Sequence, residues 1–210
     1  MKQILFNTEM VQAILAGRKS QTRRPIKAPG NEYHYDHLLG DWGLSREPEI
    51  IKITEVDGST TFYIRLPYQP GEILYVGETF ADIPETAPGN IHYKASATKA
   101  DLEWFEEEGW KWKSSRHMPK EVARIFLKVT DIRMERVQDI NPENSIAEGL
   151  NVCCDCKDHG GCYLPNVCTY LPNTFKKVWD EIYKSKGYGW DTNCWVWVIE
   201  FERCEKPDEN

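Results

Sequence analysis

An amine, a hydroxyl and several guanidinium groups follow one another in the segment Gly17 to Pro25, which reads GRKSQTRRP. Five positive charges fall between Arg18 and Lys27, with no carboxylate among them, although the whole chain has a net charge of −7. A lysine close to a threonine supplies the two groups from which an activated nucleophile can be built. The competing interpretation is a solvated surface on which the cationic side chains only cover apolar stems.

The spacing of apolar residues predicts the elements that position this segment. Residues 3 to 6 are expected to form a strand, after which Asn7 or Thr8 can cap a helix. The buried stripe of this helix consists of Val11, Ile14 and Leu15. Gly17 is placed to end the helix, so the basic segment should pass from a helix terminus into a strand.

The rest of the chain predicts a mixture of strands and short helices. Strands are expected at 50–54, 60–66, 72–79, 122–137 and 195–201, with a weaker one at 91–94. Helices are expected at 102–108, 141–148 and 174–184, and residues 28–48 form a long loop without periodicity. The last strand is apolar on both faces and should be central in its sheet. This order favours an α+β fold built on a small curved or closed sheet.

Length and composition limit the classes of function. A chain of 210 residues with 40% apolar and 28% charged residues is expected to form one compact unit. No apolar run reaches the roughly 20 residues needed to span a bilayer, and the N-terminus lacks the apolar stretch of a secretory signal. We therefore expect a cytoplasmic protein without a membrane partner. Its acidic charge argues against indiscriminate duplex binding, so any contact with nucleic acid should be local.

Five motifs together resemble the phage-type branch of the ASCH domain family. They are GRKSQTRRP, PGEILYVGET, WKSSRHMPKEVARIFLKV, a helix ending in AEGL, and the final strand WVWVIEF. The resemblance implies a PUA-like small β-barrel of about six strands with short flanking helices. It implies a single domain over residues 1–210, with a cysteine-rich insert at about 151–172. The chain departs from the branch at Gly77 and Phe80, where an arginine and a tryptophan are expected.

The resemblance also implies a cleft that accepts RNA or a modified nucleoside. Some relatives are N(4)-acetylcytidine amidohydrolases that use a lysine, a threonine and a glutamate, without a cofactor. These residues map to Lys19, Thr22 and Glu148 in this sequence. The alternatives are a non-catalytic nucleic-acid-binding module and a ribonuclease. No protein partner is evident from the sequence.

Two divisions of labour are open for such a hydrolase. In the first, Lys19 loses its proton and activates Thr22, which requires burial or nearby cations to lower the lysine pKa. In the second, Glu148 activates Thr22 or a water molecule, and protonated Lys19 stabilises the oxyanion. Because residues three apart in a strand face opposite sides, Lys19 must lie in the turn before the strand for either scheme to work.

Further residues are candidates for binding the substrate around this cleft. They are Arg18, Arg23, Arg24, Glu78, His117 and Trp195. Trp42 and Trp112 are additional candidates for stacking on a base. Aromatic residues more often serve burial than binding, so filling of the core or of a loop is the competing interpretation for each of them.

A cluster of cysteines follows the third predicted helix. Cys153, Cys154, Cys156, His159, Cys162 and Cys168 lie within 16 residues. The candidate metal ligands are Cys153, Cys156, His159, Cys162 and Cys168. Four such ligands can hold a structural zinc ion, although the spacing matches no standard paired pattern. Disulfides or free thiols are the alternatives, and nothing here favours a catalytic metal.

Overall fold

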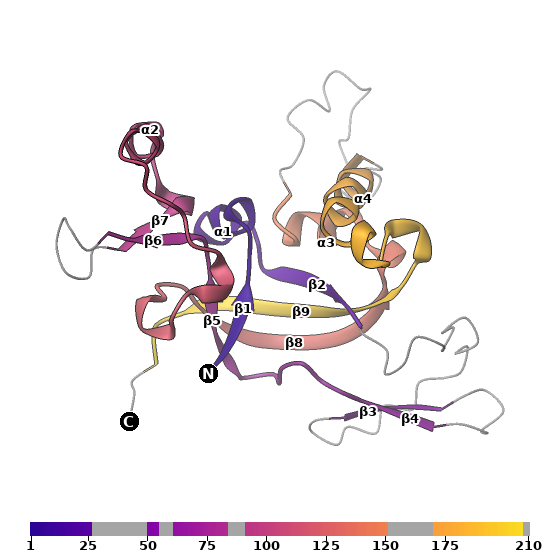
Figure 1. Cartoon of the computed structure of the whole chain (residues 1–210). Coiled ribbons are helices and arrows are strands. Elements are labelled where there is room, and N and C mark those ends of the chain that lie inside the picture. The colour runs from indigo at the N-terminus through magenta and orange to yellow at the C-terminus, as the bar shows by residue number, and fades with distance from the viewer. Residues whose placement is uncertain (27–49, 55–60, 84–90, 151–169, 208–210) are drawn as a thin grey trace.

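The computed structural model describes residues 1–26, 50–54, 61–83, 91–150 and 170–207 (Figure 1). The strands are β1 (Lys2–Leu5), β2 (Gln21–Pro25), β3 (Ile50–Thr54), β4 (Thr61–Arg65), β5 (Ile73–Gly77), β6 (Phe80–Asp82), β7 (Ile91–Tyr93), β8 (Phe126–Arg136) and β9 (Trp195–Cys204). The α-helices are α1 (Thr8–Leu15), α2 (Lys99–Glu107), α3 (Pro142–Ala147) and α4 (Tyr170–Tyr183). Every described helix is too short or too polar to span a bilayer.

Five strands form the main sheet, in the order β1-β5-β8-β9-β2. β1 runs parallel to β5, and the other neighbours are antiparallel. β8 and β9 are the longest strands, and they curve together beneath α1, α3 and α4 (Figure 1). The prediction that the last strand is central is confirmed, because β9 pairs on one side with β8 and on the other with β2.

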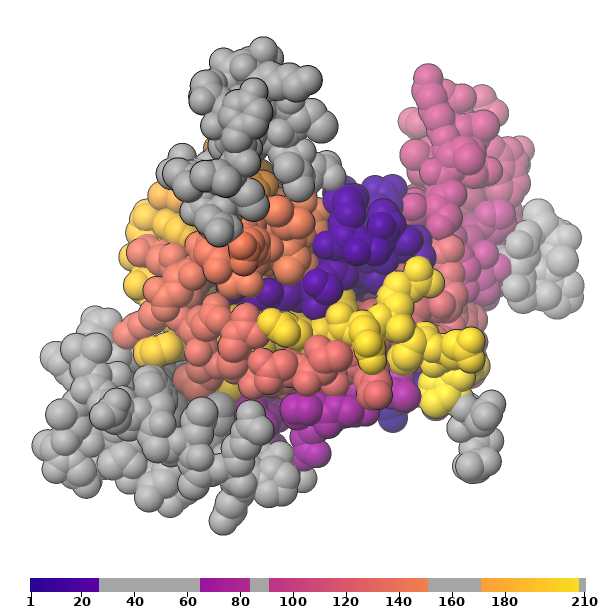
Figure 2. Space-filling view, turned by 180° about the vertical axis from the view of Figure 1, so that it is seen from behind, coloured from indigo at the N-terminus to yellow at the C-terminus, as the bar shows by residue number. Residues whose placement is uncertain are grey.

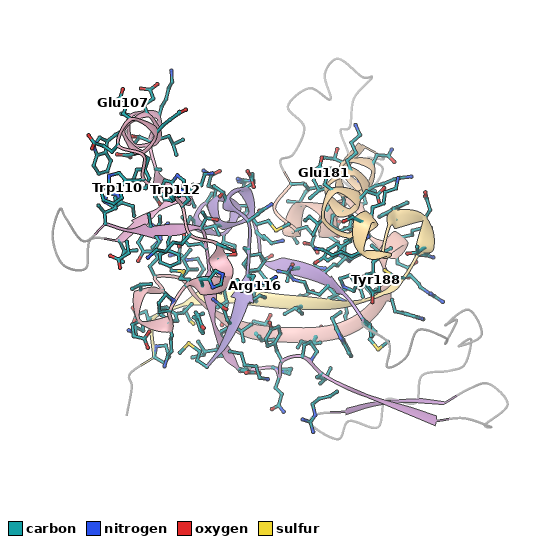
Figure 3. The ribbon with its side chains drawn as sticks, in the orientation of Figure 1. Glu107, Trp110, Trp112, Arg116, Glu181 and Tyr188 are labelled. Atoms are coloured by element: carbon teal, nitrogen blue, oxygen red, sulfur yellow. The ribbon has the colours of Figure 1, made fainter. Side chains whose placement is uncertain are left out.

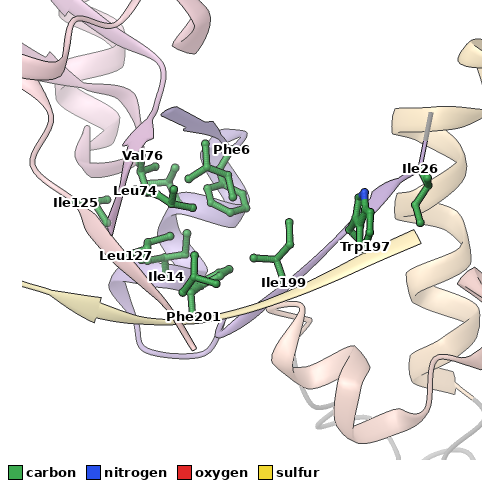
Figure 4. Packing of buried hydrophobic residues seen from close by; sticks show 14 residues of the cluster. Phe6, Ile14, Ile26, Leu74, Val76, Ile125, Leu127, Trp197, Ile199 and Phe201 are labelled. Atoms are coloured by element: carbon green, nitrogen blue, oxygen red, sulfur yellow. The ribbon is translucent and has the colours of Figure 1, made fainter. Parts of the chain in front are cut away.

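Two faces of β9 contact different helices. Its residues Trp197, Ile199 and Phe201 belong to a core cluster with Phe6 and Ile14, which packs α1 against the sheet (Figure 4). The alternate residues of β9, Val196 and Val198, pack with Phe175 and Trp179 of α4. Burying apolar side chains on both faces of β9 holds the strand against both helices.

The local signals for α1 and α3 act as predicted. Asn7 caps α1, its side-chain oxygen accepting a hydrogen bond from the Met10 amide at 2.9 Å. Gly17 follows the helix with a φ of 71°, a conformation that favours glycine. Asn141 caps α3 in the same manner, with Pro142 in its first turn, and Gly149 follows with a φ of 97°.

The α+β class is confirmed, whereas several boundaries differ from those expected. The 122–137 segment is strand only from Phe126, because residues 120–122 form a 3-10 turn. The short strand β6, which pairs with β7, was not predicted. The hairpin of β3 and β4 is present with the expected pairing. The expected loop at 28–48, which includes Trp42, lies outside the described residues.

The described strands of the main sheet form an open order, with β1 and β2 at its two edges. A side chain connects these edges, because the Arg24 guanidinium on β2 donates a hydrogen bond to the Leu5 carbonyl on β1 at 2.6 Å. The same guanidinium lies 5.3 Å from the centre of the Phe6 ring. The sheet is thus strongly curved, so that one edge strand comes within side-chain reach of the other.

Candidate functional site

Backbone contacts bring the turn after α1 against the C-terminus of α3. The Lys19 amide donates to the Ala13 carbonyl, so this lysine still lies in the turn, and β2 begins only at Gln21. Lys19 and Glu148 form an isolated antiparallel bridge, and the Ser20 amide donates to the Ala147 carbonyl at 2.9 Å. The condition set by the sequence for Lys19, that it precede the strand, is therefore met.

The ammonium group of Lys19 is buried and fully hydrogen-bonded. Its Nζ atom lies 2.9 Å from Glu148 Oε2, 2.7 Å from the Glu148 carbonyl and 2.8 Å from the Gln21 carbonyl. Lys19 is 4% exposed and Glu148 is 6% exposed. An ammonium group has three donors, and all three are used here. The carbonyl at the end of α3 also carries the negative end of the helix dipole, which favours a cation at this place.

Burial lowers the pKa of Lys19, even though the adjacent Glu148 carboxylate raises it and Arg24 and Arg23 lower it further. Desolvation is the largest of these effects, because a buried ammonium loses its hydration. The environment therefore moves the pKa of Lys19 downward, which is the direction that a general base requires.

Arg23 extends this cluster on the other side of Glu148. Its guanidinium donates to Glu148 Oε1 at 3.3 Å and to Glu135 Oε2 at 2.7 Å, with its own side chain fully buried. Glu135 in turn accepts a hydrogen bond from Arg133 at 2.6 Å, and hydrogen bonds from Arg133 and Arg23 lower its pKa against the opposing effect of burial. The Nε atom of Arg23 is buried, and no hydrogen-bond partner is present for it among the described residues.

Thr22 is 2% exposed and pairs with Ile199 of β9. Residues directly opposite in an antiparallel pair share a face, so Thr22 faces the same side of the sheet as Ile199, toward the Phe6 cluster. The Lys19 amine also reaches this side, since Nζ lies 5.6 Å from the centre of the Phe6 ring. Among the described residues, no hydrogen bond joins the Thr22 hydroxyl to Lys19 or Glu148.

The other predicted binding residues occupy several places. Arg18 is exposed and donates to the Gly149 carbonyl at 2.8 Å, and Arg24 reaches the Tyr183 hydroxyl at 3.2 Å, so both border the Lys19 cluster. Trp195 is half-buried, with the Arg136 guanidinium 4.3 Å from its ring centre. His117 is exposed in a 3-10 turn.

Glu78 forms a separate ion pair instead of joining the Lys19 cluster. Its carboxylate, 1% exposed, accepts two hydrogen bonds from Arg124, at 2.8 and 2.9 Å. The Arg124 guanidinium also lies 4.0 Å from the centre of the Tyr93 ring. This fork-shaped pairing fixes the end of β5 against the segment before β8.

The residues that sequence reasoning missed are Glu135 and Gln21. Gln21 accepts the Lys19 hydrogen bond through its backbone carbonyl, and Glu135 accepts one from Arg23, 112 residues away in the chain. The sequence around neither residue contains a motif that indicates this contact. The proposed metal ligands of the cysteine-rich insert lie outside the described residues. In the part of the chain that the structure describes, no group of three or more histidine, cysteine or acidic side chains is placed to hold a metal ion.

No protein family model matches the chain. No curated protein is significantly similar to it in sequence. Among solved structures, the chain is similar to protein EF3133 from Enterococcus faecalis V583, of family DUF984, with a TM-score of 0.43 and 9% identity over 100% of this chain and 84% of that one.

Proposed function

We propose that this protein binds RNA or a modified nucleoside and hydrolyses an N(4)-acyl amide on a cytosine-type base. In this proposal the fold is a PUA-like barrel of the ASCH domain family. The hydrogen bond from Arg24 on β2 to the Leu5 carbonyl on β1, which connects the two edges of the sheet, supports it. The observation that carries the proposal is the contact of a buried amine with a buried carboxylate, Lys19 with Glu148 at 2.9 Å, beside the Thr22 strand.

The proposed chemistry begins with Thr22. Its hydroxyl oxygen attacks the acyl carbonyl while Lys19, in its neutral form, accepts the hydroxyl proton. The C–N bond then breaks, and Lys19 gives the proton to the departing N4 nitrogen of the cytosine-type base. The acyl group remains on the Thr22 oxygen as an ester. Water hydrolyses this ester to a carboxylic acid and regenerates Thr22. The lowered pKa of Lys19 supports its role as the base.

Arg23 is assigned a positioning role. It follows Thr22 in β2 and pairs with Val198, so its side chain lies on the α4 side of the sheet, away from the Thr22 hydroxyl. Glu148 holds Lys19 and Arg23 in place from opposite sides of its carboxylate.

The burial of this cluster favours a second candidate, a non-catalytic nucleic-acid-binding module. Lys19, Thr22 and Glu148 are each at most 6% exposed, so the substrate reaches them only if the contact between α3 and the turn before β2 opens. In the second candidate, the Lys19 ammonium, whose three hydrogen-bond donors are all engaged, only stabilises the packing of α3 against the sheet, and ligands bind elsewhere.

Incubation with N(4)-acetylcytidine and with an oligoribonucleotide that contains it distinguishes the candidates. Hydrolysis predicts free cytidine and acetate from the wild type, and loss of at least about a hundredfold in rate for Thr22→Val. Thr22→Ser, which keeps the hydroxyl, should retain activity. RNA retention without turnover supports the binding module and refutes the hydrolase, and shortened RNA supports a nuclease.

A further inference from the structure

A second group of functional side chains lies in the α2 lobe, which we define as residues 80–83 and 91–117. The lobe contains β6, β7, α2 and the chain that follows, and it projects from the main body apart from α3 (Figure 2). Its cationic part is the segment Trp110 to His117, which reads WKWKSSRH and which we name the basic strip. Neither the proposed amide hydrolysis nor the Lys19 cluster uses these residues.

The basic strip alternates aromatic and cationic side chains. Trp110 and Trp112 pack against the cluster formed by Ala81, Ile83 and Phe105, whereas Lys111 and Lys113 are exposed. This alternation is what an extended backbone produces. Figure 3 shows Glu107 on the opposite side of α2 from Trp112 and Arg116.

The cations of the strip are not neutralised. Lys111, Lys113 and Arg116 are all exposed, and within the described residues none of them contacts a carboxylate. Lys113 lies 5.8 Å from the centre of the Phe80 ring, which leaves its charge available to an anion. In a protein with a net charge of −7, three unpaired cations close together in the chain favour local contact with phosphate groups.

A pocket of about 200 Å³ lies beside the strip and shares Trp112 with it. Aromatic rings form much of its wall, contributed by Tyr93, Phe105 and Trp112, with the imidazole of His92. Phe105 and Trp112 are stacked, with ring centroids 4.2 Å apart and an interplanar angle of 6°. A volume below the roughly 300 Å³ of a typical small-molecule site suits one planar ring better than a larger ligand.

Two polar groups of the pocket can recognise such a ring. The Nε2 atom of His92 is buried without a hydrogen-bond partner among the described residues. Asp101 also lines the pocket, and its Oδ2 atom is occupied by the Thr98 amide and hydroxyl, which leaves Oδ1 as an acceptor. A nucleobase carries both N–H donors and ring or carbonyl acceptors, and it can satisfy these groups while it stacks on the aromatic wall.

We propose that the α2 lobe binds single-stranded nucleic acid, with one base in the pocket and the adjacent phosphates along Lys111, Lys113 and Arg116. Single strands are held in this manner elsewhere, by aromatic side chains under the bases and cations along the backbone. A duplex cannot present an unpaired base to the pocket. This inference rests on the proposed function, in which the Lys19 cluster accepts a single nucleoside. The lobe extends the ligand to the nucleotides that flank this nucleoside in a single-stranded nucleic acid.

The test compares two charge-reversed proteins. Lys111→Glu, Lys113→Glu and Arg116→Glu are combined in one, and Lys177→Glu, Lys184→Glu and Lys186→Glu, which change exposed lysines near the end of α4, in the matched control. Binding of a fluorescent ten-nucleotide oligoribonucleotide, its deoxy counterpart and a duplex is measured by polarisation over a range of salt concentrations. The strip variant should lose at least about tenfold in affinity, and its salt slope should fall by about 2, whereas the control keeps both.

The pocket is tested by Trp112→Ala and His92→Ala, which should each weaken binding of the single strand, by about fivefold or more for Trp112. Circular dichroism checks that Trp112→Ala remains folded. If Trp112→Ala is unfolded, the charge-reversed strip variant, which alters only exposed side chains, tests the proposal by itself. Unchanged affinity and salt slope in the strip variant would overturn the proposal. Equal binding of polyglutamate would overturn it too, because any polyanion would then suffice.

Its failure is distinguishable from that of the proposed hydrolysis. Turnover of free N(4)-acetylcytidine without single-strand binding would leave the Lys19 proposal intact and refute this one. Binding of the single strand by a protein that releases no acetate would do the reverse.

Discussion

The Lys19 ammonium and the Glu148 carboxylate, 129 residues apart in the chain, lie 2.9 Å from each other with almost no exposure to solvent. Arg23 reaches the second oxygen of the same carboxylate, so that one acid is shared by two buried cations. Each charge in such a cluster is stable only while its partners remain, because desolvation is costly for an unpaired ion.

Replacing Glu148 with glutamine should therefore destabilise the fold strongly. The change removes the charge that Lys19 and Arg23 share, and loss of one partner of a buried pair costs about 3–5 kcal/mol. Glu103→Gln is the matched control, because its partner Lys99 is 90% exposed and such pairs contribute less than about 1 kcal/mol. Urea unfolding of both variants measures the difference. Equal free energies of unfolding would show that the charge of Glu148 does not stabilise the buried cluster.

The pH dependence of stability should reveal the lowered pKa of Lys19. Between its folded pKa and the usual lysine value of 10.5, the unfolded chain binds more protons at this group than the folded chain does. Stability contributed by this group therefore rises with pH across that window.

The measurement compares the wild type with Lys19→Met by urea unfolding, from neutral pH to 10.5. The free energy of the wild type relative to the variant should increase with pH, since other titrating groups cancel in the difference. A relative free energy that falls with rising pH would mean that Glu148 outweighs desolvation and raises the pKa of Lys19.

The elements around this cluster were largely predictable from local signals. Asn7, Gly17 and Asn141 mark helix ends by side-chain caps or a positive φ, which need only neighbouring residues. The place of Lys19 in the turn followed from Gly17 in the same manner. The apolar faces of the last strand indicated its central position before any pairing was known.

The partners within the cluster could not be predicted from spacing. Glu135 reaches Arg23 only because β8 and β2 flank β9 in the sheet, and this order depends on pairing between distant segments. Glu78 carries a carboxylate at a strand end, a position that suggested a site, and its ion pair with Arg124 follows from the path of the chain before β8. The strand β6 has three residues, too few for a periodic pattern.

The Glu78–Arg124 pair should depend on the shape of the arginine. A lysine at position 124 can supply neither two parallel hydrogen bonds nor a planar group over Tyr93. Arg124→Lys should lower the free energy of unfolding by about 1–3 kcal/mol, because part of a buried carboxylate is left without a donor. Arg116→Lys, at an exposed position without an ion pair among the described residues, should change it by less than about 0.5 kcal/mol. Similar stabilities of the two variants, measured by thermal unfolding, would contradict this account.

Gly149 should be intolerant of even one methyl group, because it closes the helix that carries Glu148. Its φ is 97°, and a Cβ atom there would lie 2.8 Å from Ala13 Cβ and 3.1 Å from Lys19 Cβ. Gly109 offers a matched control, since its φ is 70° and a Cβ atom would meet nothing within 4 Å. Backbone strain of about 1–2 kcal/mol applies to alanine at either site, whereas only Gly149→Ala must also move α1 or Lys19. Gly149→Ala should therefore cost at least about 1 kcal/mol more than Gly109→Ala. Gly149→Ala should also slow any amide hydrolysis that depends on the position of Lys19. Equal free energies of unfolding for the two alanine variants would mean that the turn containing Lys19 can shift away from α3 without penalty.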